Sequence, residues 1–338
     1  MSVVERVRAS ARGRWVRVGG LASLVVLAVA VASLSIGDYP MTPGQVWQTL
    51  WGGGSAVESY VVLQVRAPRM LMALLAGAAL GIAGAVLQGL LRNPLASPDL
   101  LGISGGSGLA AVFAMLVLGA SGPVLTVWAF VGGILVAALL LLAGRASTAG
   151  GYRLILAGIG VAFLTSAATN YLMVSTQIEK AQTALLWLVG SLSSTPWWQV
   201  VTLAVILAIS VPVLVLSARW LPLHQMGVPA ATSLGVPPRL VQPVAVCAAV
   251  LLTSSTAAFI GPVSFVALCA PAIARPLLGH GAIGIGTSAL LGAAILASAD
   301  LAAQFAIPGM QVPVGVVTGA LGAAFLLWLL ATSKGRHL

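Results

Sequence analysis

The sequence predicts an all-α protein that crosses a membrane many times. Hydrophobic residues make up 59% of the 338-residue chain and charged residues only 7%, whereas a soluble domain carries about 25% charged residues. Glycine is also abundant, with 39 residues, and small residues let membrane helices approach one another closely. These observations favour a bundle of packed helices in a bilayer over a soluble domain or a membrane barrel.

Ten apolar segments divide the chain, which we interpret as a single membrane domain, 1–338. A helix needs about 20 residues to cross a bilayer, and most of the segments have that length. The eighth is short and contains three prolines, so we expect a broken or half-buried helix there. The segments are residues 21–36, 68–91, 100–119, 123–144, 153–174, 198–217, 240–260, 262–278, 283–304 and 312–332.

The positive charges predict the orientation of these ten transmembrane helices. With the N-terminus inside, thirteen lysines and arginines fall on the cytoplasmic side, and three, Arg66, Arg69 and Lys180, fall outside. Cytoplasmic loops of membrane proteins carry such an excess, and an odd number of spans would scramble it. We therefore predict cytoplasmic N- and C-termini and a multi-pass location in the cytoplasmic (inner) membrane. This topology also accounts for the net charge of +10 without nucleic acid.

Three connecting stretches have sequence patterns that predict helices between the spans. Residues 37–64 contain two tryptophans and suit an interfacial helix on the outer side. The extracytoplasmic loop 175–197 contains an amphipathic piece, Ala181 to Gly190, which predicts a helix lying on the surface. The cytoplasmic loop 218–239 mixes apolar residues with turn formers, which predicts two short helices.

Several kinds of chemistry have no residues to support them. The sequence has no GxxxxGK[ST] motif, so the chain has no P-loop for ATP. Its three histidines are scattered over loops and the tail, which leaves no metal site and no catalytic residues within the membrane. Asp300 is a deeply placed acid near the outer end of the ninth span, and it is either a functional group or a residue that is partly hydrated or caps a helix end. A lone carboxylate gives little support to an ion-coupled carrier. The residues indicate a pore subunit, not an enzyme, that is powered by a partner.

A series of separated motifs resembles the FecCD family of ABC importer permeases, the type II permeases for ferric siderophores, haem and cobalamin. The similarity covers nearly the whole chain, and ten spans is the family's number. The matching motifs are Arg66-Ala67-Pro68-Arg69, Gly77 to Gly81, Gln88, Arg92 to Ala96, Leu101 to Ser104, Arg153 to Gly158, Trp187 with Gly190, Ala231 with Leu234-Gly235, Gly261 to Val266, Ala299-Asp300 and Pro313 to Thr318.

The resemblance implies that Arg66 and Arg69 receive acidic residues of an extracytoplasmic siderophore-binding protein. Arginine suits such docking because its planar guanidinium pairs well with carboxylates. The alternative is ordinary anchoring at the membrane interface.

The resemblance also implies a cytoplasmic gate and a contact with two ATPase subunits. Those subunits would bind ATP and Mg, and we expect no cofactor in this chain. Gly and Tyr stand at the second gate where the cobalamin permease has small hydroxyl residues, and Pro229 departs from the coupling pattern. The matched gate residues are Asn93, Leu95, Gly151 and Tyr152, and the matched coupling residues are Gly227, Ala231, Leu234 and Gly235.

Polar residues in the fifth span suggest the wall of the translocation pathway. Thr165, Ser166, Thr169 and Asn170 offer neutral hydrogen-bonding groups that would suit a bulky polar chelate better than a bare cation. Alternatively, these hydroxyl groups bond to their own helix backbone.

Departures from the family pattern favour a heterodimer of permease subunits, although a homodimer stays open. Gln304 stands where the family usually has Arg, and Gln311 where it usually has Glu. A partner subunit could supply the missing outer contacts. The expected function is thus membrane import of a ferric siderophore, with a cobalamin or haem permease, or an ion-coupled carrier, as alternatives.

Overall fold

The computed structural model describes residues 3–145, 151–218, 220–225, 232–235, 238–279, 283–307 and 309–332, and the regular structure within these ranges is helical. In chain order the elements are α1 (Val3–Ser35), α2 (Pro43–Leu50), α3 (Ala56–Tyr60), the π-helix η1 (Val61–Arg66), α4 (Ala67–Leu91), α5 (Ile103–Leu116), α6 (Gly122–Arg145), α7 (Gly151–Val174), α8 (Ile178–Val189), α9 (Trp197–Ala218), α10 (Leu221–Gln225), α12 (Pro238–Ile260), α13 (Val266–Leu278), α14 (Ile285–Phe305) and α15 (Val314–Thr332).

Seven helices within the described ranges are long and apolar enough to cross a membrane. Three shorter apolar helices, Ile103–Leu116, Val266–Leu278 and Val314–Leu329, accompany them. Together these helices coincide with the ten predicted segments. The all-helical membrane architecture is confirmed, and the number of complete crossings stays a prediction.

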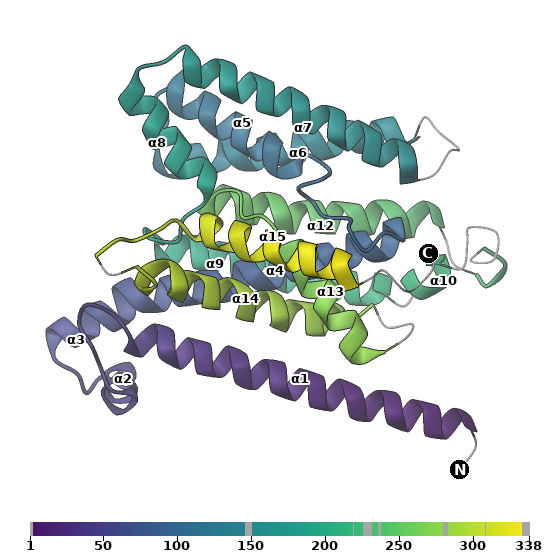
Figure 1. The fold of residues 1–338 in the computed structure, drawn as a ribbon, viewed down its shortest axis with the longest axis horizontal. Helices are drawn as coiled ribbons and strands as arrows, with labels where there is room; N and C mark the ends of the chain where they lie inside the picture. Colours follow the sequence, from purple (N-terminus) through teal and green to yellow (C-terminus); the bar gives the residue numbers. More distant parts are fainter. Residues whose placement is uncertain are drawn as a thin grey trace.

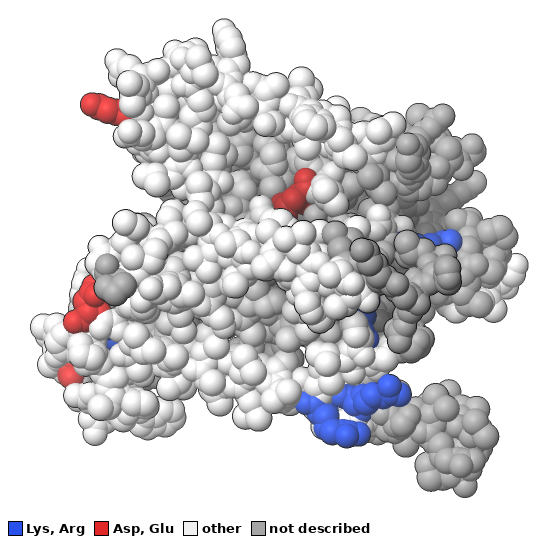
Figure 2. Space-filling view, in the orientation of Figure 1, with Lys and Arg blue, Asp and Glu red and all other residues white. Residues whose placement is uncertain are grey.

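The two ends of the chain lie on the same side of the molecule. The beginning of α1, the end of α15 and the short helix α10 share one end, and α2, α3 and α8 lie at the other (Figure 1). An even number of crossings places both ends together. Basic side chains gather mainly toward the first end and acidic ones mainly toward the second, with one acidic patch midway (Figure 2). This distribution agrees with the predicted orientation.

Helix α4 forms the centre of the bundle. Helices α9, α12, α13 and α14 pack around it (Figure 1), and every residue from Ala79 to Leu90 is buried. Helices α5, α6, α7 and α8 form a second group, which α12 joins to the first.

Glycines let neighbouring backbones touch α4 directly. A Cβ on Gly81 would fall on the Ser288 carbonyl of α14, and a Cβ on Gly84 would fall on the Ala267 carbonyl of α13. Only residues without a side chain permit so close a crossing of two helices. The small residues of this stretch therefore fix where α13 and α14 pack.

The beginning of the second span differs from the prediction. We expected the helix to begin at residue 68, but α3, η1 and α4 form a continuous helical segment from Ala56 to Leu91. Pro68 has no N–H to donate, and its ring crowds the carbonyl one turn earlier. The π-helix just before it has wider turns, and the Ala67 N–H bonds to the Val62 carbonyl. The helix therefore passes the proline without breaking.

The remaining predicted elements fall close to their observed places. The helix predicted within 175–197 is α8, Ile178–Val189, which starts three residues before the predicted Ala181, and its extracytoplasmic location stays a prediction. The eighth segment is non-helical until α13 begins at Val266. In the loop 218–239 the described part contains α10 and a short helical turn at Thr232–Ser233.

Candidate functional site

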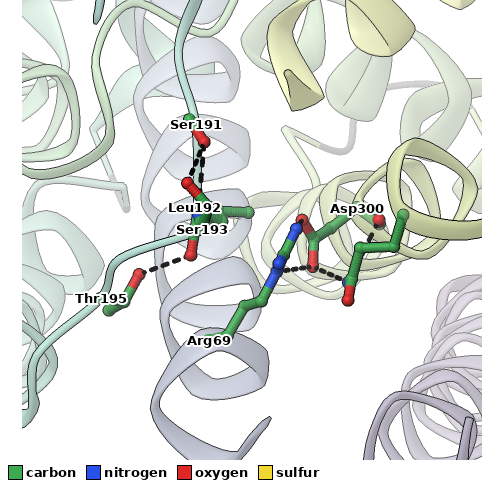
Figure 3. Close-up of polar contacts among 7 residues, drawn as sticks. Arg69, Ser191, Leu192, Ser193, Thr195 and Asp300 are labelled. Carbon is green, nitrogen blue, oxygen red and sulfur yellow. Dashed lines mark hydrogen bonds and ion pairs between the residues drawn. The ribbon is translucent and has the colours of Figure 1, made fainter. Parts of the chain in front are cut away.

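Arg69 and Asp300 form an ion pair at the outer end of the molecule (Figure 3). The Nε of Arg69 lies 3.2 and 3.0 Å from the two carboxylate oxygens of Asp300, and Nη2 lies 2.9 Å from Oδ1. One turn later on α14, Gln304 donates its side-chain amide to Oδ2 of Asp300 at 2.8 Å. The two charged side chains are only 17% and 5% exposed. The pair joins α4 to α14 and gives the deep carboxylate a partner that the sequence did not reveal.

Arg66 caps the end of helix α1. Its guanidinium donates to the main-chain oxygens of Leu34 at 2.8 Å, Ser35 at 3.4 Å and Tyr39 at 2.7 Å, and the residue is buried. The last carbonyls of a helix have no partner within the helix, and a positive charge is favourable beside them. Both arginines predicted to dock a binding protein are thus engaged within the chain, and their docking stays a prediction.

A pocket of about 230 Å³ opens beside these two arginines. Its wall comes from α1, η1, α4 and α14 and the segments that follow α1 and α14. Gln304 and Gln311 line it together with Asp38. The two glutamines are the departures from the family pattern on which the heterodimer prediction rests, and both lie in this pocket.

The predicted cytoplasmic gate residues Asn93 and Leu95 lie in one turn after α4. The Leu95 N–H donates to Oδ1 of Asn93 at 2.9 Å, and the Ala96 N–H donates to the Asn93 carbonyl at 3.1 Å. An asparagine side chain commonly holds a turn in this way. Both gate residues are half-buried. We call residues 92–102, from the end of α4 to the start of α5, the gate loop.

The second predicted gate segment begins α7. Gly151 and Tyr152 are its first residues, and the Tyr152 side chain lies outside the described part. Two turns further along, α7 touches the gate loop, since a Cβ on Gly158 would lie 2.9 Å from the Leu100 carbonyl oxygen. The two predicted gate segments are therefore connected through the first turns of α7.

The four predicted pathway residues on α7 do not share one face. Thr165 is buried and donates its hydroxyl to the carbonyls of Val161 and Ala162 in its own helix, at 2.9 and 3.0 Å. Ser166 and Asn170 are exposed, and Thr169 is half-buried. The self-bonding alternative thus describes Thr165, while Ser166 and Asn170 leave polar groups on the open side of α7.

The predicted coupling residues are described in part. Leu234 is exposed at 57%, and Gly235 has a positive φ of 79° in a turn. Gly227 and Ala231 lie outside the described residues. Within the described ranges, no group of three or more His, Cys, Asp or Glu side chains could hold a metal ion.

Sequence reasoning missed the side-chain contacts of two polar residues, Gln304 and Asp99. Gln304 completes the Arg69–Asp300 contact. Asp99, to which we assigned no role, accepts a hydrogen bond from the hydroxyl of Ser104, in the first turn of α5.

The family model of the FecCD transport family matches residues 24–332. The chain belongs to the FecCD transport family. Among FecCD relatives, the ferric enterobactin permease FepG of Escherichia coli K12 is 38% identical over 310 residues, which cover 91% of this chain and 94% of FepG. The Fe(3+)-citrate permease YfmE of Bacillus subtilis is 37% identical, with 91% and 92% covered. The vitamin B12 permease BtuC of Vibrio cholerae is 33% identical, with 94% of each chain covered.

Solved structures agree with the FecCD assignment. A metal-chelate type ABC transporter in an inward-facing conformation superposes with a TM-score of 0.83 at 29% identity, covering 94% of this chain and 99% of the other. The chain is therefore a multi-pass membrane permease subunit of the ABC transporter class. Members of this family are not themselves enzymes, and membership excludes the ion-coupled carrier.

Proposed function

We propose that this FecCD permease imports a ferric siderophore across the cytoplasmic membrane, driven by ATP hydrolysis in partner ATPase subunits. The observation that carries the proposal is the substrate of its relatives. FepG, YfmE and the Fe(3+) dicitrate permease FecD, itself 38% identical, are all named for ferric chelates. The vitamin B12 permease BtuC is less similar, at 33% identity.

The open side of α7 supports a polar cargo of this kind. Ser166 and Asn170 are exposed there, and their neutral hydroxyl and amide groups can bond to the oxygen atoms of a chelate without holding it too tightly to leave. A bare cation would favour carboxylates or histidines. A second permease subunit would close the pathway from the other side, and Gln304 and Gln311 favour one that differs from this chain.

The moving parts would be the gate loop and the segment after α9. ATP binding and hydrolysis in the partner would displace α10 and the turn at Leu234 and Gly235, and this displacement would open or close the gate at Asn93 and Leu95. The connection of α7 to the gate loop at Gly158 would let both gate segments respond together.

Transport by the purified complex in proteoliposomes tests this function. Iron-loaded siderophore delivered by the binding protein should accumulate inside only when ATP is present. Accumulation should vanish when the catalytic glutamate of the ATPase is replaced by glutamine. Vesicles without the binding protein provide the control, and concentrative uptake with the inactive ATPase would overturn the proposal.

A cobalamin permease is the second candidate because of the similarity to BtuC. Binding of ferric siderophores and of cobalamin to the cognate binding protein separates the two. Tight binding of cobalamin with no binding of a ferric chelate would replace the siderophore by cobalamin and leave the ATP-driven mechanism in place.

A test of binding-protein docking at Arg69 must use variants that keep its ion pair with Asp300. Simple charge reversal at Arg69 would also break its pair with Asp300. The swap Arg69→Asp with Asp300→Arg retains a pair but displaces the positive charge to α14. If Arg69 docks an acidic side chain, the swap should weaken binding-protein affinity and flatten its salt dependence. Unchanged affinity would leave Arg69 a purely internal residue.

A further inference from the structure

Helix α1 lies along one edge of the bundle, and α7, whose open side the proposed second subunit would cover, lies at the opposite edge (Figure 1). Only 11% of the most apolar stretch of α1 is buried, against 72% for the segment that contains α4. Large apolar side chains such as Leu21 and Leu24 are exposed on α1. Lipid therefore surrounds most of this helix, and few protein contacts hold it in place.

Two arginines lie near the end of α1 opposite to the one that Arg66 caps. Arg14 and Arg17 are both exposed, and residues three apart are neighbours on a helix surface. From Arg17 to Ser35 the helix rises about 27 Å, whereas the hydrocarbon core of a bilayer is about 30 Å thick. With Ser35 at one boundary of the core, the two guanidinium groups reach the phosphate level at the other. The exposed Trp15 suits the same level.

Neither Arg14 nor Arg17 has an acidic partner among the described residues. The Nε of Arg17 donates to the Gly13 carbonyl of its own helix at 3.2 Å. The ion pair in the described part of the chain joins Arg69 to Asp300 at the other end of the molecule. Basic side chains are visible where this part of α1 leaves the bundle (Figure 2). The two guanidinium groups thus bring positive charge that the described residues do not neutralise.

Arg14 lies against the end of α13. A Cβ on Gly279 would lie 2.7 Å from Nη1 of Arg14, and Gly279 ends α13 with a φ of +92°. Arg275, in the last turn of α13, is directed to α4 instead, because its Nη2 donates to the Ala85 carbonyl at 3.3 Å. A group bound by Arg14 would therefore contact α1 and the end of α13 together.

We propose that Arg14 and Arg17 bind the phosphate group of an anionic phospholipid where α1 meets the end of α13, and that this lipid holds α1 against the bundle. In the predicted orientation the lipid belongs to the cytoplasmic leaflet. The planar fork of an arginine bonds two phosphate oxygens at once. Phosphatidylglycerol offers this phosphate without the positively charged amine that phosphatidylcholine would place beside the arginines. The proposal does not depend on the transported substrate.

Native mass spectrometry of the full chain in detergent tests the site by titration with single lipids of identical acyl chains. Each arginine near an anionic headgroup contributes about fivefold in affinity, so phosphatidylglycerol should bind about 25-fold more tightly than phosphatidylcholine. The double change Arg14→Gln with Arg17→Gln should remove most of this preference, and each single change should remove about fivefold. Arg14→Lys with Arg17→Lys should retain part of it, because the charge stays but the fork is lost.

Two control variants separate a defined site from general attraction of anionic lipid. Arg6→Gln with Arg8→Gln removes the same charge nearer the N-terminus, and Lys180→Gln removes an exposed charge at the other end of the molecule. Both should retain most of the preference for phosphatidylglycerol. The site is overturned if the Arg6 and Arg8 variant loses as much as the Arg14 and Arg17 variant, or if the unmodified chain binds both lipids equally. Displacement of phosphatidylglycerol by inorganic phosphate at the same concentration would show an ion site and also overturn the proposal.

Distances between spin labels test whether the lipid holds α1 in place. Val16 on α1 and Leu277 on α13 are both exposed, so Val16→Cys and Leu277→Cys can carry labels in a background with Cys247→Ser and Cys269→Ala. The distance distribution should be narrow in phosphatidylglycerol nanodiscs. It should broaden in phosphatidylcholine nanodiscs, and in phosphatidylglycerol after the double glutamine change. Equal widths in the two lipids would overturn the holding role. Neither measurement involves a siderophore or ATP, so failure of the transport assay would leave both results readable.

Discussion

Removing one member of the Arg69–Asp300 pair should destabilise the protein more than removing both. Breaking a buried ion pair from one side typically costs about 3–5 kcal/mol, whereas an apolar replacement of both members is often neutral. Asp300 is the more buried of the two, at 5% exposure against 17% for Arg69. Arg69→Met should therefore lower the free energy of unfolding by about 4 kcal/mol, because it leaves the more deeply buried charge of Asp300 unpaired.

Asp300→Leu should cost less, about 2 kcal/mol, because the Arg69 guanidinium lines the outer pocket and can reach water there. The double variant should cost less than either single change. For a chain of this size about 1 kcal/mol corresponds to about 2 °C, so the apparent Tm should fall by about 8 °C for Arg69→Met and about 4 °C for Asp300→Leu.

Thermal unfolding of the purified permease in detergent measures this series. Lys180→Met is the matched control, since it removes an exposed charge from the same side of the membrane and should shift Tm by less than about 1 °C. If both single variants behave like Lys180→Met, or if the double variant loses as much as the two singles combined, the pair does not hold α4 to α14 as argued.

Three further predictions concern stability. Arg66→Met removes the guanidinium donor from the Leu34 carbonyl at the end of α1 and from the Tyr39 carbonyl beyond it, whereas the Ser35 carbonyl retains the Met41 N–H. The change should lower the free energy of unfolding by about 3 kcal/mol, and limited proteolysis should then cut faster between α1 and α2. Arg66→Lys should recover only part of this loss, because an ammonium group cannot reproduce the planar fork. Gly84→Ala should lower Tm by about 6 °C, because the new methyl group meets the backbone of α13. Gly160 has open space around it, so Gly160→Ala should raise the free energy of unfolding by up to about 1 kcal/mol. Equal shifts in Tm for the two variants would contradict this reasoning. Phe265→Gly should be more stable than Phe265→Ala by about 1 kcal/mol, because only glycine adopts its positive φ without cost; the reverse order in Tm would show that backbone strain is absent there.

The membrane architecture could be predicted because composition dictates it. A chain with so few charged residues must cover its backbone polar groups within helices, and the ten apolar segments accordingly coincide with helices. The continuous helix through Pro68 could not be predicted, since a proline normally signals a helix start or break. No characteristic amino-acid pattern signals the π-helix that accommodates the proline.

The polar contacts of the candidate site were beyond sequence reasoning for a different reason. Arg69 and Asp300 were each noticed, one for docking and the other as an isolated acid, but no pattern joins residues that lie on helices so far apart in the chain. By contrast, the turn at Asn93 and Leu95 is local, and its asparagine signals it directly.

The open side of α7 has a consequence for how the cell handles this protein. Asn170 and Ser166 are exposed on a helix of which only 11% of the most apolar stretch is buried. A newly inserted chain that has not met the proposed second permease subunit would present an amide and a hydroxyl to lipid, where unpaired polar groups are costly. The exposed polar face of α7 thus marks an unassembled subunit, and membrane quality-control proteases can use it to distinguish unassembled chains from assembled ones.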